Sequence, residues 1–113
     1  MKALINMIRF MFYTNKVDRY HGKVEDAIRR KALSVANVEF HRTMGNFYGE
    51  MLMEIDPHQD WWGFANAKQK QHNHHNDFLM QQQRVDEGNV KVLACKRSLL
   101  AAQKVLSELP DTN

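Results

Sequence analysis

Three histidines stand close together in the second half of the chain, and histidine both binds metals and titrates near neutral pH. His72 and His75 are three residues apart, so a helix places them on one face, whereas His74 points elsewhere. Zinc needs three or four converging ligands, whereas the nearby candidates are Asn76 and Asp77, with His58 beyond the predicted turn. We therefore predict no metal and no cofactor, with His72 and His75 as weak candidate ligands. The segment is better interpreted as a solvated polar face, with a histidine-rich contact surface or pH-sensitive patch as the alternative.

Little in the sequence points to catalysis. Glu50, Glu54 and Asp56 are acidic neighbours, but nothing is predicted to face them across a pocket. Ser34 and Ser98 lie in helical stretches without an evident base. The sequence contains neither a GxGxxG nor a Walker motif. We predict that the protein is not an enzyme.

Charge is distributed unevenly along the chain, whose net charge is +3. Residues 1–31 carry a net charge of +5 and residues 32–60 a net charge of −4. The basic block, with Tyr13 and Tyr20 available for stacking, is typical of a surface that contacts phosphates and bases. It makes a small basic nucleic-acid-binding protein the alternative function, although no known DNA- or RNA-binding signature is present. The candidate contacts are Lys16, Arg19, Lys23, Arg29, Arg30 and Lys31.

Apolar and aromatic side chains outnumber what a small hairpin can bury. The chain has seven methionines, and methionine adapts to irregular surfaces. Trp61 and Trp62 crowd the start of a predicted helix; the simpler interpretation is that they close the end of a helical hairpin. If exposed, they are instead a binding hot spot. The candidate protein-binding residues are Trp61, Trp62, Phe64, Tyr48 and Met53.

A seven-residue period in the second half of the chain predicts the element that positions these groups. An α-helix places residues i, i+3 and i+7 on one face, so the period indicates one long helix over residues 60–109 with a buried seam. Only Gln71 interrupts the apolar series. The series comprises Phe64, Phe78, Val85, Val92, Leu99 and Leu106, with Ala67, Cys95, Ala102 and Leu109 three residues on.

A second helix is predicted over residues 23–55, ended by Pro57. We expect an apolar stripe spaced by threes and fours to be its packed face. Gly45 and Gly49 mark either a close approach of another element or a kink or groove, and Asp60 can cap the following helix. The stripe comprises Leu33, Ala36, Phe40, Met44, Phe47, Met51 and Ile55.

The predicted fold is all-α: an antiparallel hairpin of these two long helices in a single domain, residues 1–113. Residues 3–13, with Leu4, Ile8 and Met11 on one face, predict a short helix that packs on the hairpin after a connection at 14–22. A coiled-coil homodimer through the helix of residues 60–109 is the alternative. The lone Cys95 and the lack of a long apolar run favour a cytoplasmic protein without membrane contact.

The functional hypothesis is a non-catalytic interaction module that binds and modulates, by inhibition for example, a larger partner protein. A small chain without catalytic motifs suits a virus- or mobile-element-encoded inhibitor of a host enzyme. A homo-oligomeric structural or assembly protein is a further alternative, and a homodimer is compatible with both protein-binding hypotheses.

Overall fold

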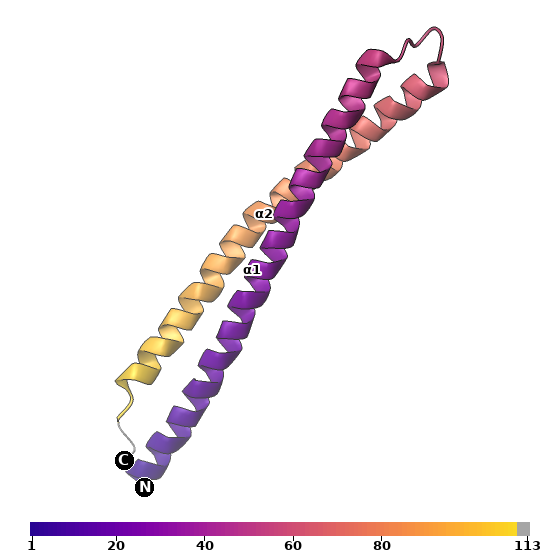
Figure 1. Ribbon diagram of the computed structural model, residues 1–113. Helices are drawn as coiled ribbons and strands as arrows, with labels where there is room; N and C mark the ends of the chain where they lie inside the picture. The colour runs from indigo at the N-terminus through magenta and orange to yellow at the C-terminus, as the bar shows by residue number, and fades with distance from the viewer. Residues whose placement is uncertain (111–113) are drawn as a thin grey trace. The chain divides into compact units, whose positions relative to one another are not determined.

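The computed structural model describes residues 1–110, which form two helices and no strand. Helix α1 spans Lys2–Glu54 and helix α2 spans Trp61–Glu108 (Figure 1). The all-α class and the helical hairpin are therefore confirmed. Contacts divide the described residues into two compact units: unit 1 comprises residues 1–30 and 88–110, and unit 2 comprises Lys31–Glu87.

The turn between the helices belongs to unit 2 and is built by two aspartates. The Oδ1 atom of Asp56 accepts a hydrogen bond from the backbone N–H of His58 at 2.9 Å, and its carbonyl oxygen accepts one from the N–H of Asp60 at 2.9 Å. Asp60 Oδ1 in turn accepts from the N–H of Gly63 at 2.9 Å, the geometry of an N-cap. A Cβ atom on Gly63 would collide with this carboxylate, so glycine leaves room for the cap.

The seven-residue seam of α2 is its packed face in both units. In unit 2, Phe64, Phe78 and Val85 are half-buried, and Ala67 is buried. In unit 1, Val92, Leu99 and Ala102 are buried. Within each unit this seam packs on α1 of the same chain, as a helical hairpin requires.

The predicted short N-terminal helix is wrong, because α1 runs without interruption through residues 14–22. That segment contains no proline, and its one glycine, Gly22, costs a helix only about 1 kcal/mol. Val17 and Tyr20 are half-buried in unit 1 and thus contribute packing that favours the helix there. Leu4, Ile8 and Met11, expected to form the packed face, are exposed.

The face of α1 that packs in unit 2 also differs from the prediction. Half-buried positions alternate in spacings of three and four, but they lie one residue beyond most members of the predicted stripe. They are Ser34, Val38, His41, Gly45, Tyr48 and Leu52. Leu33, Phe40 and Phe47, expected inside, are 64%, 54% and 49% exposed. The packed face of α1 therefore includes the more polar of the two stripes. Of the predicted apolar stripe, Met44, Met51 and Ile55 are half-buried, and the other four members are exposed.

Neither helix offers a stretch of sufficient length and hydropathy to cross a bilayer within residues 1–110.

Candidate protein-interaction site

Three of the five predicted protein-binding residues are strongly exposed at the hairpin turn of unit 2. Met53 is 89% exposed near the end of α1, and Trp61 and Trp62 are 68% and 74% exposed at the start of α2. The two indole rings lie side by side, with centroids 6.5 Å apart and planes tilted by 49°. The interpretation that the tryptophans close the end of the hairpin is therefore wrong. We call Met53, Trp61 and Trp62 the tip residues.

The other two predicted residues, Tyr48 and Phe64, belong to the interior of unit 2. Both are half-buried on the packed faces of their helices. The ring of Tyr48 stacks on His74, with centroids 5.8 Å apart and planes 12° apart. The Nζ atom of Lys70 lies 5.5 Å from the centroid of the same ring, within cation–π range. Tyr48 and Phe64 thus do not share the exposed surface of the tip residues.

A histidine pair crosses the seam of unit 2, which the sequence did not reveal. The Nδ1 atoms of His41 on α1 and His74 on α2 are 2.9 Å apart, a hydrogen bond whose direction depends on the tautomers. Phe40 packs edge-on against both rings, at centroid distances of 5.1 Å and 6.0 Å. His74 lies three residues after Gln71 of the seven-residue series, at a position equivalent to Ala67. No feature of the sequence distinguished His41, whose role depends on how the two helices are aligned.

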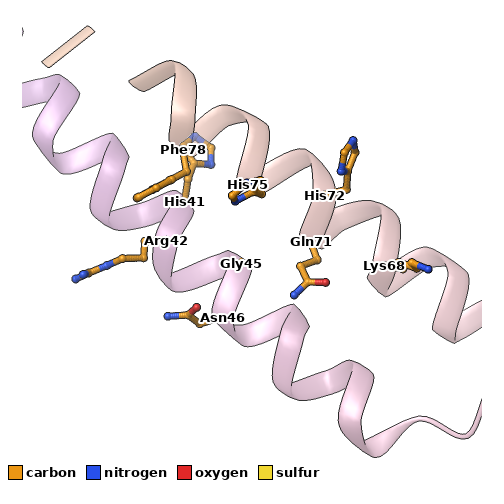
Figure 2. A pocket seen from close by; sticks show the side chains of 9 residues that line it. All are labelled: His41, Arg42, Gly45, Asn46, Lys68, Gln71, His72, His75 and Phe78. Atoms are coloured by element: carbon orange, nitrogen blue, oxygen red, sulfur yellow. The ribbon is translucent and has the colours of Figure 1, made fainter. Parts of the chain in front are cut away.

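An open groove of about 480 Å³ runs beside this pair, between the two helices of unit 2. Gly45 forms part of its wall, and nothing lies within 4 Å of a Cβ atom built there. The polar side chains that line the groove do not point toward one common position. Arg42 extends away from α2, and His72 extends away from α1 (Figure 2). Arg42 is bonded to Glu39 at 2.6 Å. The groove therefore has donors along its edge but no built ligand site.

Gly45 and Gly49 of α1 each fit one of the two interpretations made from the sequence, a groove or a close approach of another element. A Cβ atom at Gly49 would lie 3.0 Å from Nε2 of Gln71, so α2 approaches closely there. Gly45 borders the groove instead.

The weak metal candidates do not meet further ligands. The Nε2 atom of His72 lies 3.2 Å from the amide nitrogen of Asn76, and His75 stacks with Phe78 at 6.5 Å. Across the described part of the chain, no group of three histidine, cysteine, aspartate or glutamate side chains is arranged to hold a metal ion.

The basic side chains predicted to contact nucleic acid make different contacts within the structure. The Nζ atom of Lys16 lies between 5.5 and 6.0 Å from the ring centroids of Phe12, Tyr13 and Tyr20. The Nζ atom of Lys23 lies 5.2 Å from the ring centroid of Tyr20. Lysine side chains therefore lie against the tyrosine rings that were expected to stack with bases.

The remaining basic candidates differ in how freely they present charge. Arg30 forms an ion pair with Asp26 at 3.1 Å, and Lys31 is half-buried. Arg19 and Arg29 are exposed. The structure thus presents fewer free cations on this face than the sequence suggests.

Large apolar side chains remain exposed along both helices of the described chain. Leu33, Met53, Trp61, Trp62 and Leu100 are among those more than 60% exposed. The buried apolar side chains of residues 1–110 are Val24, Ala27, Ala67, Val92, Leu99 and Ala102. Half of these are alanines, so the large apolar side chains contribute little to the interior. Exposed large apolar side chains are candidates for an interaction surface where they lie together.

No family model matches the chain, and neither a curated protein nor a solved structure is significantly similar to it. Function is therefore inferred from the surface of the molecule.

Proposed function

We propose that this protein is a non-catalytic interaction module whose hairpin tip binds a larger protein. The exposure of Trp61 and Trp62 side by side carries this proposal. Tryptophan provides a large contact area with few rotatable bonds and is enriched among the residues that dominate binding energy. The capped turn from Asp56 to Asp60 and the first turn of α2 hold both indoles on regular backbone, so little ordering is needed when a partner binds.

The charge around the tip favours a protein partner over nucleic acid. Unit 2 contains eight acidic and five basic residues. Glu54 and Asp60 directly adjoin tip residues in sequence, and Asp56 lies in the turn between them. A phosphate backbone is repelled by such a surface. We infer a partner with an apolar pocket and a basic rim, so that the indoles enter the pocket while the carboxylates face the rim. Occupancy of that pocket is the means by which the protein modulates its partner.

A capture experiment with matched variants tests this function. The tagged full chain is used to recover proteins from native lysate with and without nuclease, in parallel with the double variant Trp61→Ala/Trp62→Ala. Phe12→Ala is the control, because Phe12 is an exposed aromatic residue of unit 1. We expect one stoichiometric protein that survives nuclease, is lost with the double variant and is retained with the control.

Two results contradict the proposal. Recovery that disappears with nuclease moves the function to the basic block of α1. A partner that the double variant binds as well as the native chain excludes the tip as the binding site, provided that circular dichroism shows unchanged helicity.

A further inference from the structure

A row of basic residues runs along α1 in unit 1 at intervals of seven. Residues seven apart lie close to one line along an α-helix, so these side chains share one side of it. All of them are exposed except Lys16, which is half-buried. The members of this basic row are Lys2, Arg9, Lys16, Lys23 and Arg30.

Exposed apolar side chains alternate with the first three members of the basic row. Ile5 lies three residues after Lys2 and four before Arg9. Phe12 lies three residues after Arg9 and four before Lys16. Residues three and four apart are neighbours on a helix surface, so each apolar side chain stands between two cations. The Nζ atom of Lys16 lies 6.0 Å from the ring centroid of Phe12, as this neighbourhood requires.

The apolar surface continues around the helix from this edge. Ile8 is three residues from Ile5 and four from Phe12, so it adjoins both. Leu4 and Met11 share a face with Ile8, and all of these side chains are exposed. Exposed apolar side chains that lie together mark an interaction surface. We call this group the outer patch; it comprises Leu4, Ile5, Ile8, Met11 and Phe12.

The net charge of unit 1 is opposite to that of unit 2. The described part of unit 1 contains eleven basic and four acidic residues, a net charge of +7 with histidine neutral. The eight acidic and five basic residues of unit 2 give a net charge of −3. Residues 1–17, which carry the outer patch, contain three basic residues and no acidic one. This charge attracts an anionic partner and repels a basic one.

The side chains beside the cations favour a lipid surface over nucleic acid as that partner. Proteins that bind single-stranded nucleic acid combine cations with aromatic rings on which bases stack. Four of the five side chains of the outer patch have no aromatic ring, and Lys16 already lies within cation–π range of Tyr13 and Tyr20. Basic residues beside exposed leucine, isoleucine and phenylalanine are typical of helices that lie in the headgroup region of a bilayer.

We infer that unit 1 docks on the surface of an anionic lipid bilayer through residues 2–16 of α1. The outer patch enters the boundary between headgroups and acyl chains, and the basic row contacts the lipid phosphates. The expectation of a protein without membrane contact rested on the lack of a long apolar run, and a helix that lies along a bilayer surface does not need one. The inference goes beyond the proposed function, because it concerns unit 1 and uses none of the tip residues.

Co-sedimentation of the full chain with lipid vesicles tests this surface. One set of vesicles contains equal parts of phosphatidylcholine and phosphatidylserine, and the other contains phosphatidylcholine alone. We expect binding to the anionic set that weakens with added salt, and much weaker binding to the neutral set. Equal binding to both sets, or binding to neither, overturns the inference.

Two double variants test the two halves of the surface separately. Leu4→Gln/Ile8→Gln should reduce the affinity for anionic vesicles by at least about tenfold, because less apolar surface enters the bilayer. Lys2→Glu/Arg9→Glu should reduce it by at least about tenfold, because two cations near the headgroups become anions. If either variant binds as well as the native chain while circular dichroism shows unchanged helicity, the inference is wrong.

Matched variants in unit 2 are the controls. Leu33→Gln/Phe40→Gln changes two exposed apolar residues of α1, and Lys68→Glu/Arg84→Glu changes two exposed basic residues of α2. Both should change the affinity for anionic vesicles little. Losses equal to those of the unit 1 variants would show that the contact is not specific to residues 2–16, which overturns the inference.

The remaining outcomes separate this inference from the proposed function and from nucleic-acid binding. Trp61→Ala/Trp62→Ala should retain vesicle binding, and its loss would move the lipid contact to the hairpin tip and overturn the inference. A native chain that binds labelled single-stranded DNA but not anionic vesicles assigns the basic row to nucleic acid instead. Neither result bears on whether the tip residues capture a protein partner.

Discussion

The imidazole rings of His41 and His74 face each other across the seam of unit 2, with their Nδ1 atoms 2.9 Å apart. In such a contact one ring donates through Nδ1–H and the other accepts with the lone pair of its Nδ1 atom. Both residues are half-buried. Polar partners on an otherwise packed helical seam fix the register of the helices at some cost in stability. The pair therefore aligns α1 with α2 at one point in unit 2.

Removing either histidine of this pair is expected to destabilise the protein. His41→Ala and His74→Ala should each lower the free energy of unfolding by about 1 kcal/mol, because each leaves the other Nδ1 without its partner. The double variant should cost less than the two single variants together. Urea unfolding followed by circular dichroism measures all three. His75→Ala, at an exposed position on the same helix, should change little, and additive effects of the pair would show that the rings are not coupled.

The packed face of α2 could be predicted because six of the seven positions in its seven-residue series are apolar. Helix α1 presents two faces. Hydrophobicity selects the one with Leu33, Phe40 and Phe47, yet the structure packs the neighbouring face with Ser34 and His41. The seam of α2 opposite is itself polar, with His74 and Gln81. Which face of α1 packs thus depends on matching two helices, and one sequence pattern cannot supply that match.

The candidate site could be predicted only in part, because the sequence does not show which side of a helix faces inward. The Trp61–Trp62 pair could be identified from residue type and from its place beside a turn, although its exposure could not. Tyr48 and Phe64 were expected on the binding surface and lie inside, because their positions belong to the packed faces. A turn brings residues together through local backbone bonds, which sequence signals describe well; the inward or outward direction of a helix residue depends on distant contacts.

Gln81 is the most buried polar residue of the seam and is expected to reduce stability. Its side chain is only 6% exposed, and its Oε1 atom has no hydrogen-bond partner. Gln81→Leu should raise the free energy of unfolding by about 1–2 kcal/mol, because it removes an unsatisfied buried acceptor and adds apolar packing. Thermal or urea unfolding measures the change. The matched control is Gln82→Leu, at the adjacent exposed position. A loss of stability in Gln81→Leu would mean that the amide has a bonded role that the leucine cannot replace.

Asp60 is expected to stabilise the start of α2 as its N-cap. Asp60→Ala should lower the free energy of unfolding by about 1 kcal/mol, because the N–H of Gly63 loses its acceptor. Asp60→Asn should retain most of the stability, since asparagine also caps helices well. Gln59→Ala, one residue earlier in the turn, is the control for simple truncation. If the alanine and asparagine variants unfold alike, the cap does not contribute to stability.

Two helical glycines of α1 should respond differently to the same substitution. Alanine is favoured over glycine inside a helix by about 1 kcal/mol. Gly45→Ala should gain this amount, because nothing lies within 4 Å of the added Cβ atom. Gly49→Ala should gain less, because its Cβ atom would lie 3.0 Å from Nε2 of Gln71, which must then move. Urea unfolding of both variants compares them directly. Adding Gln71→Ala to Gly49→Ala relieves the contact and should restore the gain relative to Gln71→Ala alone; equal gains in the two single variants would show that Gln71 moves aside without cost.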